Sequence, residues 1–290
     1  YAGTINLGGS LDIRTTSHPA DFTSARIVRM LGGSSRRRAP SERMVERFAR
    51  IYTPAVLSLA FLVALLPPLV AGGGWRHWLH EGMVVLLIAC PCALVISTPV
   101  TVAAALASAA RRGVLIKGGA FLEELGVVRR MGFEHPGVLT LGCPGDGYDP
   151  PREEAEQAMR QLQDAGVATA AGAMPPGEAR PAAWVTAGGS GSRDGDLTIA
   201  FGSQSLDAAI ETADVVVLAD DLMRLPFAVR HARRSLRIIR QNVAVAVGLK
   251  LAFLVVAIAG SATLWMALAA DMGATWLVVL NGLRMLWAKP

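Results

Sequence analysis

The feature that most limits the fold is a long stretch without charge, residues 83–110, which contains the sequence LLIACPCALVIS. A helix needs about 20 predominantly apolar residues to cross a hydrocarbon core of about 30 Å. Uncharged stretches of this length are rare in soluble domains, because their helices expose one polar face. The stretch therefore predicts a membrane-spanning helix, and a buried helix of a globular core is the weaker interpretation.

Four apolar runs are long enough to span a membrane as helices. They are residues 51–71, 83–105, 241–259 and 263–286. The segment GGGWRHWLHEG joins the first two runs, and its tryptophans suit a membrane–water interface; the segment GSAT joins the last two. The pattern predicts an α-helical membrane protein with four transmembrane helices arranged as two hairpins.

Basic residues gather at the ends of these runs, in a chain that is 52% hydrophobic and carries a net charge of +5. By the positive-inside rule, this bias predicts a multi-pass protein of the cell membrane with both termini and the long central segment cytoplasmic. Nucleic-acid binding is not favoured, since the arginines do not interleave with exposed aromatic residues. The basic residues concerned are Arg36, Arg37, Arg38, Arg43, Arg47, Arg50, Arg111, Arg112, Lys117, Arg230, Arg233, Arg234, Arg237 and Arg240.

The parts of the chain outside the apolar runs are predicted to be soluble. The segment PREEAEQAMRQLQDAG predicts an amphipathic helix, with proline at its start, acids in its first turn and glycine after its end. The segments DLTIAF and DVVVLAD predict short buried strands, so residues 113–225 are expected to be α/β. Residues 1–30 contain two strand-like runs around a Gly-Gly turn. Residue 1 is Tyr and no signal peptide is recognised, which is consistent with a fragment.

Four chemically distinctive residues are predicted to lie at one depth in the membrane. At about 1.5 Å per residue, Cys90 and Cys92 lie roughly 12 to 15 Å from the outer end of their helix, and Lys250 and Asp271 roughly 15 Å from their turn. Pro91 removes a backbone hydrogen bond, which exposes carbonyl groups and turns both thiols toward one cavity. Two thiolates and a carboxylate suit a soft or borderline divalent ion such as zinc or cadmium, and the Lys250 ammonium balances charge.

Plainer interpretations of the same residues stay open. Lys250 and Asp271 can form an ion pair that only holds two helices together, although charges at this depth usually mark a substrate pathway. Cys90 and Cys92 can be small packing residues, as buried cysteines often are. Three cysteines are too few for a disulfide framework, so a reduced pair is expected rather than a bridge. Cys143, alone in a predicted loop, is interpreted as an incidental thiol.

Several motifs resemble heavy-metal transporting P-type ATPases of the zinc, cadmium and lead type. The segments CPCALVISTP and RRGVLIKGG are similar to the metal-site helix of that family and the segment after it. The segments AIETADVVVLADDL, RRSLRIIRQN and ATLWMALAADMGATWLVVLNGLRML look like the end of its phosphorylation domain and its last two core helices. The resemblance implies that Cys90, Cys92 and Asp271 bind the metal, that Lys250 is a built-in counter-ion, and that Mg-ATP drives transport.

The catalytic motifs of that family are altered in this sequence. The stretch FEHPGVLT stands where a phosphorylatable Asp-Lys-Thr-Gly-Thr is expected, and it places Glu134 at the Asp position. Phosphoryl transfer depends on position, and a misplacement of about 1 Å can cost on the order of 100-fold in rate. Only a short stretch stands where a nucleotide-binding domain is expected, and the magnesium loop keeps Asp194 as its one candidate ligand. ATP-driven transport is therefore predicted to be lost.

The resemblance also divides the chain into five predicted parts. They are residues 1–35, a C-terminal remnant of an actuator domain; residues 36–50, a basic juxtamembrane helix; residues 51–110, a transmembrane hairpin with the CPC motif; residues 111–225, a reduced phosphorylation-like (HAD-like) α/β domain without the nucleotide-binding domain; and residues 226–290, a C-terminal transmembrane hairpin. The expected partners are the lipid bilayer and a metal ion. Two alternative functions stay open. The chain could be a non-enzymatic metal-binding or regulatory partner of an intact pump, or it could be a remnant without function. An intact pump, or missing helices on another chain, would be a further partner.

Overall fold

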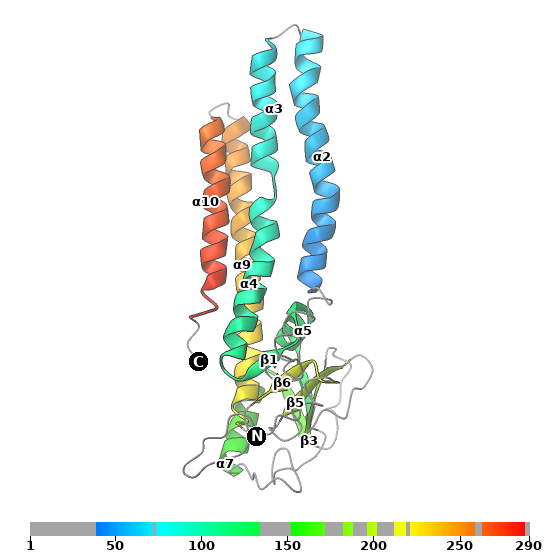
Figure 1. Ribbon diagram of the computed structural model, residues 1–290, viewed down its shortest axis with the longest axis vertical. Coiled ribbons are helices and arrows are strands. Elements are labelled where there is room, and N and C mark those ends of the chain that lie inside the picture. Colours follow the sequence, from blue (N-terminus) through cyan, green and yellow to red (C-terminus); the bar gives the residue numbers. More distant parts are fainter. Residues whose placement is uncertain are drawn as a thin grey trace, which may run out of the picture.

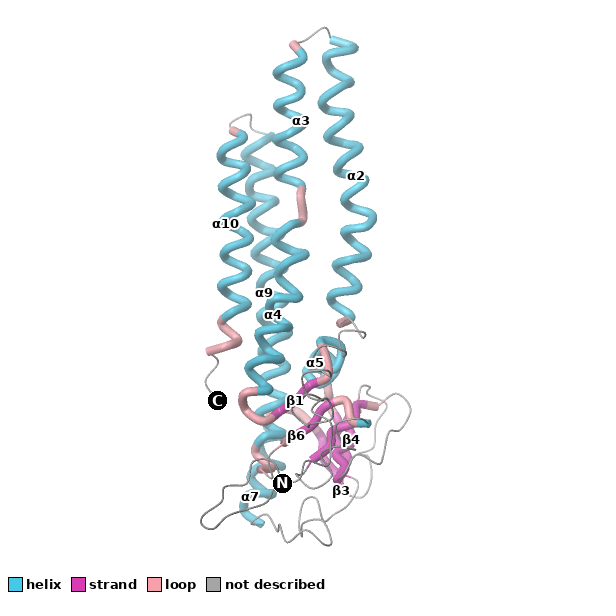
Figure 2. The backbone as a smooth tube through the Cα atoms, in the orientation of Figure 1, coloured by secondary structure: helices cyan, strands magenta, loops and turns pink. Residues whose placement is uncertain are grey.

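The computed structural model consists of a bundle of long helices with a small sheet against one end of it (Figure 1, Figure 2). The predicted remnant at residues 1–35, Glu134 and Asp194 lie outside the residues that it describes. The described residues are 39–71, 74–133, 152–171, 182–187, 196–201, 212–218, 221–258 and 263–287.

Two helical hairpins make up the described part of the bundle (Figure 1). The first is formed by α2 and by α3, which continues into α4, and the second by α9 and α10. The lower half of α9 continues past the bundle and packs against α5 and α7 beside the sheet. The bounds of these long helices are α2 (Pro40–Ala71), α3 (Trp75–Ala89), α4 (Cys92–Ala110), α9 (Arg224–Ile258) and α10 (Leu264–Leu283).

Three helical stretches among the described residues are long and apolar enough to cross a membrane. They are α2 as far as Val70, α3 and α4 taken together across the break between them, and α10. The first, second and fourth predicted runs are thereby confirmed as helices of membrane length. The third run, residues 241–259, is helical as far as Ile258 and forms the second half of α9. Its role as a fourth span stays a prediction.

Two helix boundaries differ from those predicted. α3 begins at Trp75, so most of the segment GGGWRHWLHEG is helical rather than a connection. Gly74 lies just before it in an extended conformation, with φ −64° and ψ 121°, and residues 75–82 contain no proline that would interrupt the helix. Aromatic and charged residues indicate an interface, but they do not stop a helix. Similarly, α2 begins at Pro40 and unites the predicted juxtamembrane helix with the first span.

The described strands form one sheet in the order β1-β6-β5-β4-β2-β3. β1 runs antiparallel to β6, and the other neighbouring strands are parallel. The predicted strands DLTIAF and DVVVLAD are confirmed as the buried strands β5 and β6, and the predicted amphipathic helix is confirmed as α7. The elements of this α/β part are β1 (Val114–Ile116), α5 (Gly119–Val127), β2 (Arg130–Phe133), α7 (Arg152–Asp164), β3 (Ala168–Ala171), β4 (Ala182–Ala187), β5 (Leu197–Phe201) and β6 (Val215–Val217).

One arginine of α9 ties the α/β part to the bundle. The Arg233 guanidinium donates to the carbonyls of Gly126 at 3.3 Å and Val128 at 2.8 Å, and also to the carbonyl of Ala165. These carbonyls lie at the C-terminal ends of α5 and α7, where helical partners are missing and a positive charge is favoured. The contacts therefore fix the direction in which α9 enters the bundle.

A carboxylate of α5 ties the start of α2 to the α/β part. Glu123 accepts a hydrogen bond from the backbone N–H of Ser41 at 3.1 Å and a second from the Ser41 hydroxyl. Burial raises the pKa of Glu123 above its ordinary value near 4.5, while the hydrogen bonds from Ser41 act in the opposite direction. An acceptor at this position satisfies backbone donors that the first turn of α2 leaves free. The α/β part thus positions both α2 and α9.

Candidate metal centre

The helix that carries the two cysteines is broken at its middle. α3 ends at Ala89 and α4 begins at Cys92, and Cys90 and Pro91 lie between them outside helical geometry. Pro91 lacks an N–H group, and its ring clashes with the carbonyl four residues earlier. The residue before a proline is driven toward an extended conformation, and Cys90 has φ −59° and ψ 124°. The break therefore frees carbonyl groups for other partners, as Pro91 predicts.

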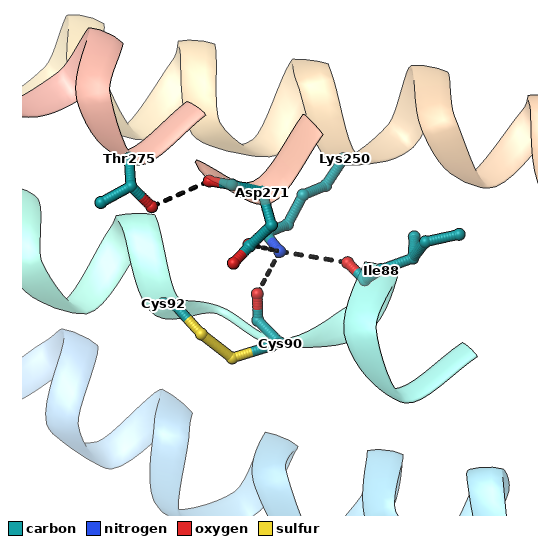
Figure 3. The surroundings of a disulfide bond; sticks show 6 residues. All are labelled: Ile88, Cys90, Cys92, Lys250, Asp271 and Thr275. Carbon is teal, nitrogen blue, oxygen red and sulfur yellow. Dashed lines mark hydrogen bonds and ion pairs between the residues drawn. A yellow bond between two sulfur atoms is a disulfide. The ribbon is translucent and has the colours of Figure 1, made fainter. Parts of the chain in front are cut away.

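The ammonium group of Lys250, on α9, fills this break (Figure 3). Its Nζ donates to the carbonyl of Ile88 at 3.1 Å, to the carbonyl of Cys90, and to Oδ1 of Asp271 at 3.1 Å. Three oxygen atoms, two from the broken helix and one from α10, thus surround one positive charge. The break therefore holds a positively charged side chain of the protein itself.

Lys250 and Asp271 form an ion pair that is largely withdrawn from the surface, with side chains 21% and 15% exposed. The Thr275 hydroxyl donates to the backbone carbonyl of Asp271 at 2.9 Å. A cavity of about 10 Å³ lies against the pair, with Ile88 and Phe253 in its lining. This volume is close to the roughly 10 to 15 Å³ that one water molecule needs. The two residues, which are predicted to lie at one depth, thus meet in the structure as an ion pair.

The two sulfur atoms lie on the opposite side of the break. Cys90 and Cys92 are joined as a disulfide, with Cα atoms 5.5 Å apart, whereas the sequence predicts a reduced pair. The reason is local: the extended Cys90 and the first residue of α4 direct their side chains to the same side. Figure 3 shows the disulfide facing away from Asp271 and toward α2. A cavity of about 410 Å³ lies there, lined by both cysteines, Pro91 and residues of α2 such as Thr53.

The structure therefore brings some of the predicted ligands together and separates others. Lys250, Asp271 and the backbone of Cys90 meet, but the sulfur atoms and the Asp271 carboxylate line different cavities. Within the described ranges, no group of three His, Cys, Asp or Glu side chains is placed to hold a metal ion. Thiolates, not a disulfide, bind metals, so a site with all three ligands requires reduction and a rearrangement of the break.

A second polar cluster, on the side of the break nearer the sheet, was not predicted. Nδ2 of Asn242 donates to Oγ1 of Thr101 at 3.3 Å and to the carbonyl of Val278 at 3.2 Å. Oδ1 of Asn242 accepts from Nδ2 of Asn281 at 2.8 Å, and Asn242 is only 1% exposed. Asn242 links α4, α9 and α10, which carry Cys92, Lys250 and Asp271. The sequence offers one signal, an asparagine eight residues before Lys250 on the same helix.

No family model matches the chain. Over its whole length the chain is 29% identical to a probable cadmium-transporting ATPase of Staphylococcus aureus strain MRSA252, and it covers 61% of that relative. It is 47% identical over 143 residues to the zinc/cadmium/lead-transporting P-type ATPase of Escherichia coli strain K12, which is 49% of this chain and 20% of the relative. A crystal structure of a zinc-transporting PIB-type ATPase in the E2.Pi state matches with a TM-score of 0.68 and 28% identity, over 93% of this chain and 68% of that one.

The chain is shorter than the curated relatives that it matches from end to end. It spans 61% of the length of the Staphylococcus aureus relative. The alignment runs over 444 positions, whereas the chain has 290 residues and all of them are covered. That relative therefore has internal sequence for which this chain has no counterpart.

Proposed function

Because the homologues of this chain are cadmium-, zinc- and lead-transporting P-type ATPases, we propose that it is a membrane protein that binds a divalent heavy metal within the bilayer. The ligands in this proposal are the thiolates of Cys90 and Cys92 and the carboxylate of Asp271, and Lys250 is the counter-ion. The proposal includes the loss of ATP-driven transport.

The observation that carries the metal proposal is the ammonium of Lys250 among three oxygen atoms at the break. An apolar bundle does not place two free carbonyls and a carboxylate around one point unless a cation is held there, because each unpaired polar group costs free energy in a medium without water. The same break holds the two sulfur ligands. Soft thiolates favour zinc or cadmium over magnesium or calcium.

Charge balance supports the same set of residues. Without metal, the Lys250 ammonium and the Asp271 carboxylate cancel, and neutral thiols or a disulfide add no charge. With a divalent ion bound, the three negative charges of two thiolates and one carboxylate balance the two positive charges of the ion and the one of Lys250. Both states are neutral, which matters because an uncompensated charge inside a membrane is costly. Binding to the reduced protein then releases two protons per metal ion, one from each thiol.

The test is metal binding by the full chain, purified in detergent and reduced. We expect one zinc or cadmium ion per chain, with two protons released, as measured by titration calorimetry in buffers of different protonation enthalpy. The variant Cys90→Ser/Cys92→Ser should lose binding, and Asp271→Asn should weaken it. The matched control Cys143→Ser, which removes the third thiol, should bind like the unmodified chain. Full binding by the double serine variant would overturn the proposal.

The residues at the altered motifs do not fit the binding of Mg-ATP or phosphoryl transfer from it. The family's phosphorylatable aspartate is replaced by Glu134, and one candidate carboxylate, Asp194, remains in the stretch that resembles the magnesium loop. A hard Mg²⁺ ion needs several oxygen ligands in near-octahedral geometry. The internal sequence that the Staphylococcus aureus relative has and this chain lacks is consistent with a missing nucleotide-binding domain.

Transfer of label from ATP carrying a radioactive γ-phosphate tests this part of the proposal. We expect no acid-stable phosphoenzyme under conditions that label an intact zinc pump in the same preparation. Label that appears on this chain and disappears in Glu134→Ala would show that phosphorylation survives.

The proposed topology places the sheet and both termini in the cytoplasm. Basic residues at the sheet end of the bundle support it: Arg43, Arg47 and Arg50 lie near the start of α2, and Arg111 follows α4. A membrane-impermeant maleimide should therefore label Cys143, which belongs to the central segment, in inverted vesicles and not in intact cells. Labelling in intact cells would reverse the orientation.

A further inference from the structure

A large apolar groove runs along the bundle between α2 on one side and α3, α4 and α9 on the other. Its volume is about 530 Å³, and its walls include Tyr52 and Leu59 of α2, Leu94 of α4, and Val247 and Leu251 of α9. Figure 1 shows α2 standing apart from α4 and α9 over this stretch. The volume lies within the roughly 300 to 1,000 Å³ typical of small-molecule sites.

The dimensions of the groove match one leaflet of a bilayer. On α2 its lining extends from Phe48 to Leu59, which is about 16 Å of helix. Half of a hydrocarbon core of about 30 Å has nearly the same length. The groove is open at its side, because Leu59 and Leu251 remain 52% and 57% exposed. An acyl chain can therefore enter from the surrounding lipid.

Beyond the end of the groove nearer the sheet, α9 carries two exposed arginines. Arg240 lies seven residues before Val247, so both are on the same face of α9, and it is about 15 Å from the level of Lys250. Arg237 lies one turn further on. Both arginines are exposed, and neither forms an ion pair with a carboxylate in the described part of the chain. With Lys250 at its predicted midplane position, this distance places Arg240 at the level of the lipid headgroups.

We propose that this groove binds one acyl chain of an anionic phospholipid, with the lipid phosphate on Arg240 and Arg237. A guanidinium group pairs with phosphate through two parallel hydrogen bonds, which makes arginine well suited to this contact. The apolar walls hold the chain, and the two charges select the headgroup. The inference does not depend on the metal site, although Lys250 also lines the groove, so the acyl chain packs beside the residue that occupies the break.

Native mass spectrometry of the full chain in detergent tests the site with dioleoyl phosphatidylglycerol and dioleoyl phosphatidylcholine as probes. Because each basic residue near a membrane surface contributes about 1 kcal/mol to anionic lipid binding, Arg237→Gln/Arg240→Gln should weaken phosphatidylglycerol binding about tenfold or more. The matched control Arg76→Gln/Arg111→Gln removes the same charge from exposed positions, nine residues before Val85 and seventeen residues after Leu94, and should leave binding unchanged.

A second pair of variants tests the groove itself without a change of charge. Val247→Phe fills part of the groove and should reduce binding of both lipids, whereas Val255→Phe, on an exposed position that does not line it, should not. Equal binding of both lipids by all variants would overturn the proposal. So would a dimer whose population falls with Val247→Phe, because the groove would then hold a second copy of the chain.

Discussion

Replacement of Lys250 by Met should be the most damaging single change in the membrane part of the protein. It removes the donor for the carbonyls of Ile88 and Cys90 and leaves the Asp271 carboxylate without its counter-ion. Loss of one partner of a buried ion pair typically costs about 3 to 5 kcal/mol. The two side chains retain some exposure, so a cost of about 3 kcal/mol is expected for Lys250→Met.

Replacement of the partner carboxylate, in Asp271→Asn, should destabilise the protein less than Lys250→Met. In Asp271→Asn the two carbonyl groups still hold the Lys250 ammonium, so we expect a cost of about 1 to 2 kcal/mol. The double variant Lys250→Met/Asp271→Asn contains neither charge. Its cost should therefore fall short of the sum of the single variants by at least about 1 kcal/mol, which is the coupling energy of a directly contacting pair.

Unfolding by sodium dodecyl sulfate in mixed micelles, followed by circular dichroism, measures these free energies. Arg76→Met, which removes an exposed cation from the outer end of α3, serves as the control and should have little effect. If the single costs add without coupling, or if Asp271→Asn is more destabilising than Lys250→Met, the ammonium does not hold the break as described.

Three further predictions concern contacts between helices. Because burial holds the pKa of Glu123 above its ordinary value, the protonated acid stabilises the fold fully below the unfolded pKa near 4.5, and this stabilisation is lost as pH rises through the folded pKa. Glu123→Gln should therefore become more stable relative to the unmodified chain as pH rises from the unfolded pKa through the folded pKa of Glu123, and an unchanged difference in unfolding free energy would contradict this. Asn242→Leu removes hydrogen bonds to two helices and should cost about 1 to 2 kcal/mol in the same unfolding assay; a neutral effect would show that the cluster does not hold the helices. Gly282→Ala places a Cβ atom 2.7 Å from Oγ1 of Thr101 and should cost about 1 to 3 kcal/mol, whereas Gly248→Ala meets no atom within 4 Å and should be neutral or stabilising.

The sequence predicts the parts of the site that depend on distance along a helix. Pro91 predicts the break and its freed carbonyls, because the effect of proline is local. Counting residues from the turn of the second hairpin places Lys250 and Asp271 at one depth, and they form an ion pair. The strands β5 and β6 follow from short apolar runs of the length that buried strands have.

The parts that depend on packing could not be predicted in this way. The sulfur atoms face α2 because of how the broken helix is rotated in the bundle, and residue spacing carries no information about that rotation. The hydrogen bonds of Asn242 join three helices, so its role is visible only when all three are in place. The start of α3 at Trp75 was also not predicted, because interfacial residues are compatible with a helix that continues past the membrane surface.

The central claim is that the cysteines at the break bind a divalent metal, and X-ray absorption at the zinc K edge tests it most directly. The full chain is reduced, loaded with one equivalent of zinc and compared with Cys90→Ser/Cys92→Ser. The account predicts sulfur scatterers at about 2.3 Å from zinc that vanish in the double variant. A zinc ion with only oxygen or nitrogen neighbours at about 2.0 to 2.2 Å in the reduced, unmodified chain would contradict it.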